Sequence, residues 1–153
     1  MLFLVFELAR DRYVLDASQV VEVLPLGAIT KIPQAPPAVA GILNYRGAPV
    51  PVIDLSQLTL GRPAERRLST RIVLAHYSDA DGRPRLIGLV AERATRTVRR
   101  EETDFVASGV TSEGTPYLGP VAADARGMMQ RLDVRTLLPA SVRDMLFRQP
   151  TAE

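Results

Sequence analysis

His76 is the only histidine of the chain, and cysteine is absent. These two facts exclude metal sites built from histidine pairs or thiolates, and they exclude cysteine nucleophiles. His76 lies in an apolar run that is followed by Asp79 and Asp81. This context favours a structural or partly exposed histidine over a catalytic base. We therefore expect no metal centre around His76.

Carboxylates and glycines add no catalytic pattern. Asp16, Glu22 and Asp54 are the only carboxylates in apolar surroundings, and they are interpreted as a turn closure, a residue on the exposed face of a strand and a helix cap. Gly41 and Gly47 flank a hairpin and not a strand-to-helix junction, so no phosphate-binding loop is predicted. No serine lies in a Gly-x-Ser-x-Gly motif. We expect a protein that is not an enzyme and has no cofactor.

The charge of the chain is carried mostly by arginine. Lys31 is the single lysine among 19 basic residues, the net charge is +2 and the sequence pI is about 9.4. The pairs Arg66-Arg67 and Arg99-Arg100 have acidic neighbours, which favours solvated faces over a nucleic-acid-binding stripe. Aromatic residues make up only 5%, so platforms for base stacking are few. No nucleic-acid partner is expected, but a small β-barrel nucleic-acid-binding module stays open as the alternative function.

The N-terminal residues do not predict export or membrane insertion. Residues 1–6 are apolar but lack a basic flank, and Glu7 interrupts them. No stretch reaches the roughly 18–20 apolar residues that a membrane span needs. We expect a cytoplasmic protein that does not insert into a membrane.

Short β segments dominate the first half of the chain. Residues 2–8 and 13–15 are apolar runs around a polar turn, which predicts a hairpin. Residues 18–24 are rich in valine, and only Glu22 interrupts their apolar run. A strand with two apolar faces places one face in the core, and the other must meet a second element or a partner.

A second hairpin and a short helix follow a loop of three prolines at 33–37. The hairpin comprises residues 39–43 and 50–53, with Gly47 suited to a positive φ in the turn. Asp54 is expected to cap a helix over 55–60 that ends at Gly61. Residues 61–70 are polar and rich in arginine, and they predict an exposed connection.

The second half repeats the β pattern and ends in a predicted helix. The expected strands are 71–77, 85–91, 94–98, 116–122 and 127–132. From about Ala140 to Phe147 the apolar spacing is helical. A faint similarity between the opening hairpin and the one near residues 72–98 suggests two similar barrels.

Several ordered motifs resemble the CheW-type coupling domains. The segment Gly41-Ile42-Leu43-Asn44-Tyr45-Arg46-Gly47, with Val50–Leu55 after it, resembles the signature hairpin of that family. The segments Phe3–Leu8, Tyr13–Asp16 and Val20–Val23 match the opening strands of the family in order and spacing, and Ile29–Pro33 fits as well. The later segment Ile87–Val90 resembles a strand of the family's second barrel. The resemblance is strongest over residues 1–60 and is faint beyond residue 100.

The resemblance implies a mainly β fold of two five-stranded SH3-like barrels that share an apolar core, with short helices. The whole chain, residues 1–153, is expected to form one domain. The first barrel would span about 13–70 and the second about 71–132, with a contribution of the N-terminal strand to the second left open. A C-terminal helix is expected at about 139–147.

The resemblance also implies an adaptor that joins the regulatory domain of a CheA-type histidine kinase to the cytoplasmic tip of methyl-accepting chemoreceptors. Such an adaptor lies in the cytoplasm at membrane-associated arrays, and whether it self-associates in rings stays open. The residues implied to bind receptor or kinase are Val20, Glu22, Val23, Gly41, Asn44 and Arg46. Two structural alternatives stay open, namely that both valines are core residues and that Arg46 forms a salt bridge within the protein, with Glu22 as one acceptor.

The sequence also departs from the usual family pattern. Tyr45 stands where an aliphatic residue is typical, and Met128–Asp133 is more polar than the corresponding strand of the family. Together with the arginine-rich connection, these departures resemble divergent coupling proteins such as those of Wsp-type surface-sensing arrays.

Overall fold

The computed structural model describes residues 1–147, and these residues form a mainly β structure. Their nine strands are β1 (Leu2–Leu8), β2 (Asp11–Asp16), β3 (Val20–Pro25), β4 (Val39–Tyr45), β5 (Ala48–Asp54), β6 (Arg71–Ser78), β7 (Pro84–Arg99), β8 (Leu118–Asp124) and β9 (Gly127–Leu132). The helices are α1 (Leu55–Leu60) and α2 (Ala140–Arg143), with single 3-10 turns at Ala17–Gln19, Glu102–Asp104 and Val134–Thr136. None of the helices in this part of the chain has the length and apolar character that crossing a bilayer requires.

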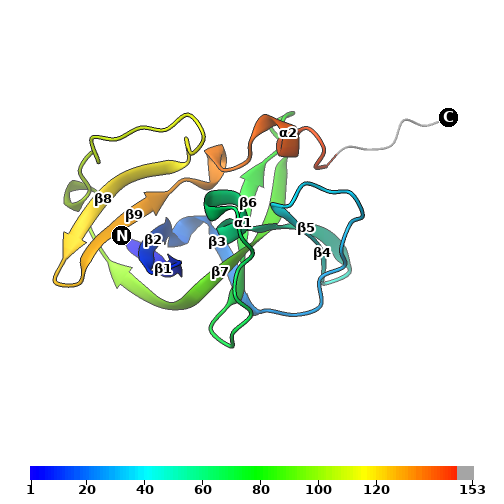
Figure 1. The fold of residues 1–153 in the computed structure, drawn as a ribbon, viewed down its shortest axis with the longest axis horizontal. Helices are drawn as coiled ribbons and strands as arrows, with labels where there is room; N and C mark the ends of the chain where they lie inside the picture. The colour runs from blue at the N-terminus through cyan, green and yellow to red at the C-terminus, as the bar shows by residue number, and fades with distance from the viewer. Residues whose placement is uncertain (148–153) are drawn as a thin grey trace.

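The strands form two sets that have β7 in common (Figure 1). In the first set the order is β4-β5-β7-β6-β3, with the β5–β7 pair parallel. In the second set the order is β7-β1-β2-β9-β8, with the β2–β9 pair parallel. Each set therefore contains five strands, as expected for two barrels of five strands each.

The two sets do not follow one another along the sequence. The expected division placed residues 13–70 in one barrel and 71–132 in the other, but β6 and the first part of β7 pair with strands of the first set. The N-terminal hairpin of β1 and β2 pairs with β7 and β9 in the second set. The strand pairing thus differs from a division by sequence order, because each set combines strands from both halves of the chain.

β7 is one strand of 16 residues, where two strands at 85–91 and 94–98 were expected. The expected gap at residues 92–93 is absent, because Arg93 adopts a φ of +50° within the continuous strand. The register of β1 against β7 shifts at the same place, between Val5 and Glu7. A β-bulge bends the strand without ending it, and this bend lets β7 serve both sets.

Three apolar clusters fill the fold. The largest lies between the two sets and contains side chains of β1, β2, β5, β6 and β7. A second cluster lies in the first set, around Val52, Ile72 and Leu74. The third lies in the second set, around Phe3 and Met129. The mainly β fold with a shared core is confirmed.

The two helices differ in how well they match the prediction. α1 is confirmed, because Asp54 Oδ1 accepts a hydrogen bond from the Gln57 N–H at 3.2 Å and Gly61 ends the helix with a φ of +75°. The C-terminal helix was predicted too long, at about 139–147, whereas α2 comprises only Ala140–Arg143. The chain then continues in turns, and Phe147 has a φ of +61°, which a helix cannot accommodate.

An ion pair joins β2 to the end of β8. Arg12 Nη2 lies 2.6 Å from Asp124 Oδ1 and Arg12 Nη1 lies 2.9 Å from Asp124 Oδ2, so the pair is bidentate. Asp124 Oδ1 also accepts a hydrogen bond from the Arg126 N–H at 2.8 Å. The hydrogen bonds from Arg12, followed by that from Arg126, hold the pKa of the Asp124 carboxyl well below its usual value.

Replacing Asp124 with asparagine should lower the free energy of unfolding at pH 7 by about 1–2 kcal/mol, because charge-assisted hydrogen bonds are lost. A carboxylate whose pKa is lower in the folded state stabilises the fold above its unfolded pKa of about 4, and this contribution is lost as the pH falls further. The deficit of Asp124→Asn should therefore shrink as the pH falls from about 5 to about 3. Urea unfolding of both proteins at several pH values measures this deficit. A deficit that does not change with pH would contradict the lowered pKa of Asp124.

Candidate partner-binding site

The tip of the β4–β5 hairpin is a two-residue turn. Tyr45 pairs with Ala48, so Arg46 and Gly47 alone connect the strands. Their φ angles are +51° and +86°, the combination of a type I′ turn. The Asn44 Oδ1 atom accepts a hydrogen bond from the Gly47 N–H at 2.9 Å, which fixes the turn. The positive φ predicted for Gly47 is confirmed, and Arg46 projects from a rigid tip.

Arg46, Tyr45 and Glu22 form a polar cluster, here called the edge cluster, between β3 and β4. The Tyr45 hydroxyl donates a hydrogen bond of 2.6 Å to Glu22 Oε2, and Arg46 Nη2 lies 3.8 Å from the same oxygen. The Arg46 guanidinium also lies 5.2 Å from the centre of the Tyr45 ring. The hydrogen bond to Glu22 raises the pKa of the Tyr45 hydroxyl. This cluster joins the two outer strands of the first set.

The edge cluster leaves Arg46 available to another molecule. The Arg46 side chain is 77% exposed although it lies close to Glu22. An exposed ion pair at this distance contributes little to folding stability. A guanidinium held at a rigid tip can donate paired hydrogen bonds to a carboxylate or to backbone carbonyls of a partner. The contact of Arg46 with Glu22 therefore does not exclude a role of Arg46 in binding.

Val20 and Val23 face the interior of the protein. Val20 pairs with Ala75 and Val23 pairs with Val73, and both valines pack against the cluster between the two strand sets. Both valines are partly buried, so the chain itself covers this part of β3 only in part.

Val21 is the exposed apolar residue of β3, and the sequence analysis did not single it out. The register between β3 and β6 shifts between Val20 and Glu22, so Val21 is the extra residue of a β-bulge. Its side chain is 40% exposed. A bulge breaks the inside–outside alternation of a strand, and for this reason counting from Glu22 did not identify Val21. In the sequence, only the apolar pair Val20-Val21 before the single charge of Glu22 pointed to an exposed apolar residue here.

Gly41 is buried and has a structural role in the hairpin. Its φ is +146°, and an added Cβ would overlap the carbonyl oxygen of Thr30. Thr30 and Ile42 exchange two backbone hydrogen bonds, of 2.9 and 2.8 Å. The missing side chain of Gly41 therefore lets the segment before β4 lie against the hairpin.

The six residues predicted for binding thus divide into two groups. Glu22, Asn44 and Arg46 lie together at the outer end of the first set, whereas Val20, Val23 and Gly41 support this edge from inside. His76 is exposed on β6. Within residues 1–147 no three His, Asp or Glu side chains are arranged to hold a metal ion. The geometry of the edge cluster suits recognition of a protein surface.

The chain is similar to known proteins over most of its length. The family model of the CheW-like domain matches residues 2–142. The chain is 24% identical over 138 residues to the chemotaxis protein CheW of Klebsiella aerogenes, a match that covers 89% of this chain and 80% of that protein. It is 23% identical over 137 residues to the chemotaxis protein CheW of Bacillus subtilis, covering 88% and 85%. The crystal structure of the scaffolding protein TtCheW from Thermoanaerobacter tengcongensis superimposes with a TM-score of 0.82 at 27% identity, covering 95% of this chain and 92% of that one.

Proposed function

Because this chain belongs to the family of CheW-like domains, we propose that it is a non-catalytic adaptor that couples a CheA-type histidine kinase to the cytoplasmic tips of methyl-accepting chemoreceptors. Members of this family are scaffold proteins, and a relative of the same fold carries that description. An adaptor of this kind acts by holding its partners in one geometry, which shifts the populations of kinase states without any bond being made.

The observation that carries the proposal is the edge cluster on the first strand set. Arg46 is held at a rigid turn with its guanidinium exposed, and the apolar Val21 lies on the neighbouring edge strand. The tip of a receptor is a helical hairpin, which offers carbonyl and carboxylate oxygens beside apolar side chains. We propose that the edge cluster binds the receptor tip and that the regulatory domain of the kinase binds another surface.

Replacing Arg46 with alanine should weaken binding of a receptor cytoplasmic fragment about tenfold, the equivalent of about 1.4 kcal/mol, and leave binding of the kinase regulatory domain unchanged. The physical reason is the loss of a positioned guanidinium from the contact. Isothermal titration calorimetry with each partner from the same genome measures both affinities. Arg83→Ala is the matched control, since Arg83 is an exposed arginine at the turn between β6 and β7.

Val21→Asp tests the apolar part of the same surface without disturbing the core, because Val21 lies in the exposed bulge. It should weaken receptor binding and leave kinase binding intact. Unchanged receptor binding by both variants would refute the assignment of the edge cluster. Absence of saturable binding to any CheA-type regulatory domain would refute the adaptor function itself.

The proposal also includes the location, the self-association and the signalling system of the adaptor. We place it in the cytoplasm, at membrane-associated receptor arrays, where copies of the chain self-associate in rings. The divergence at Tyr45 and along Met128–Asp133 is our reason for including Wsp-type surface-sensing arrays among the systems to be tried. The nucleic-acid-binding alternative is not favoured, because the family match extends over residues 2–142.

A further inference from the structure

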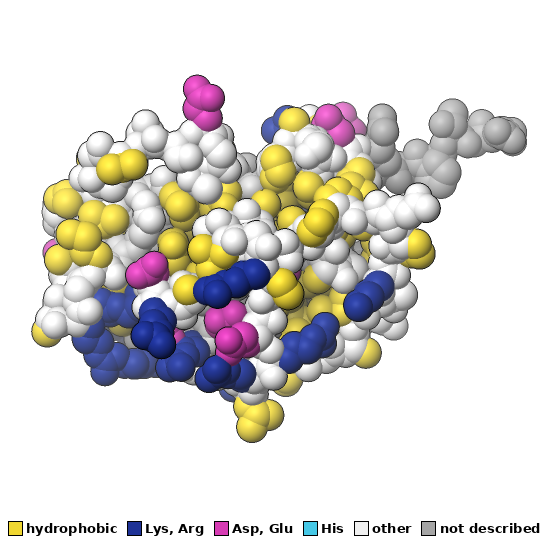
Figure 2. Space-filling model, viewed as in Figure 1, with side chains coloured by type: hydrophobic (Ala, Val, Ile, Leu, Met, Phe, Trp, Pro, Cys, Tyr) yellow, Lys and Arg dark blue, Asp and Glu magenta, His cyan; other side chains and the backbone are white. Residues whose placement is uncertain are grey.

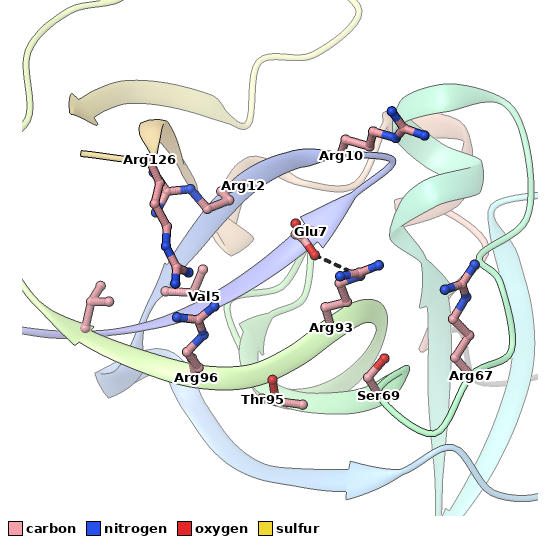
Figure 3. A pocket seen from close by; sticks show the side chains of 11 residues that line it. Val5, Glu7, Arg10, Arg12, Arg67, Ser69, Arg93, Thr95, Arg96 and Arg126 are labelled. Carbon is pink, nitrogen blue, oxygen red and sulfur yellow. Dashed lines mark ion pairs between the residues drawn. The ribbon is translucent and has the colours of Figure 1, made fainter. Parts of the chain in front are cut away.

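A basic pocket lies on the second strand set (Figure 3), and none of its lining residues belongs to the edge cluster. It has a volume of about 610 Å³ and an apolar floor of Val5 and Val98. Its walls carry the arginines Arg10, Arg12, Arg67, Arg93, Arg96 and Arg126. These residues come from the β1–β2 turn and β2, from the connection before β6, from β7 and from the β8–β9 turn. Figure 2 shows basic side chains gathered along the lower part of the face that it draws.

Half of these arginines have a carboxylate partner and half do not. Arg12 is paired with Asp124 at 2.6 Å, Arg93 with Glu7 at 3.0 Å, and Arg67 with Glu65. Within residues 1–147, no carboxylate oxygen lies within 4.0 Å of a side-chain nitrogen of Arg10, Arg96 or Arg126. These three guanidinium groups therefore form no ion pair within the described part of the chain.

Two of these charges are directed to the same space. Arg96 on β7 and Arg126 in the β8–β9 turn point toward one another beside Val5 in Figure 3. Like charges that converge in this way repel each other, and an anion between them converts the repulsion into attraction. From this geometry we propose that the pocket binds a compact ligand with two or more phosphate groups.

The composition of the pocket suits phosphate groups. Guanidinium groups match phosphate oxygens with paired hydrogen bonds, and Ser69 and Thr95 add hydroxyl donors to the walls. The volume lies within the roughly 300–1,000 Å³ of small-molecule sites. None of the residues that line the pocket is aromatic. Bases of single-stranded nucleic acid would find no stacking partner there, so the pocket recognises the phosphates themselves.

The test is titration of the full chain with sodium tripolyphosphate by isothermal titration calorimetry. We expect saturable one-to-one binding with a Kd below about 1 mM at low salt. The double variant Arg96→Gln with Arg126→Gln should bind at least about tenfold more weakly, because two guanidinium groups that contact phosphate are removed. Arg83→Gln should bind as the unmodified chain does, because Arg83 lies outside the pocket. Urea unfolding of the variants verifies that each is folded.

Three outcomes would overturn the proposal. The first is no saturable binding of tripolyphosphate to the unmodified chain. The second is equal binding by the unmodified chain and the double variant, which would place the anion elsewhere. The third is tighter binding of a single-stranded oligonucleotide than of tripolyphosphate with the same dependence on Arg96 and Arg126, since the surface would then belong to a nucleic-acid interface.

Discussion

Replacement of Gly41 by alanine should lower the free energy of unfolding by about 3 kcal/mol, which is a large part of the stability of a domain of this size. Gly41 has a φ of +146°, a backbone conformation that a residue with a side chain rarely adopts. In addition, the new methyl group would overlap the carbonyl oxygen of Thr30 and lie 2.7 Å from Ile29 Cγ2. The Thr30 backbone cannot move away without breaking its two hydrogen bonds to Ile42.

Gly47→Ala is the matched control for this prediction. Gly47 also has a positive φ, of +86°, but nothing lies within 4 Å of the position of an added Cβ. Gly47→Ala should therefore lower the free energy of unfolding by only about 1 kcal/mol, the penalty of the positive φ alone. Urea unfolding of both variants measures the difference. Equal losses would mean that the close approach of Thr30 to Gly41 contributes nothing to stability.

The local elements of the first strand set could be predicted because their signals lie within a few residues. Asp54 and Gly61 mark the two ends of α1, and both have the predicted capping roles. The turn at Gly47 was equally local. In such segments the side chain, the backbone angle and the hydrogen bond that decide the structure belong to neighbouring residues.

The arrangement of the strands could not be predicted in the same way. The pairings of β5 with β7 and of β2 with β9 are parallel and join segments far apart in the chain. Arg93 falls between the two strands expected at 85–91 and 94–98, whereas the structure places it, with a positive φ, within the continuous β7. Register and partner choice depend on packing against distant strands, which a local apolar pattern does not encode.

The candidate sites show the same limit. The contact of Glu22 with Arg46 was anticipated from the residue types. Val21 was not singled out, because no local sequence pattern indicates the bulge. The basic pocket was not anticipated either, since Arg10, Arg96 and Arg126 are separated by many residues. In the sequence, each of these three arginines is compatible with a solvated surface, and only the fold brings them together.

Phe6→Ala should be the most destabilising change considered for this chain, with a loss of about 4 kcal/mol in the free energy of unfolding. Phe6 is fully buried in the cluster between the two strand sets, where its ring stacks on Tyr13 at a centroid distance of 5.9 Å. Since this cluster contains side chains from both sets, the cavity weakens both together. Native-state hydrogen exchange should show faster exchange by a similar factor in β5 and in β9.

Phe3→Ala separates the shared core from the interior of one set. Phe3 lies on the same strand and is equally buried, but it packs in the cluster of the second set, 5.1 Å from the ring of Phe105. Its removal should accelerate exchange in β9 more than in β5, although the lost apolar area is the same. If Phe6→Ala instead accelerated exchange in one set only, the two sets would unfold independently. A cooperative response would mean that β7 and the shared core hold the edge cluster and the basic pocket on one folding unit.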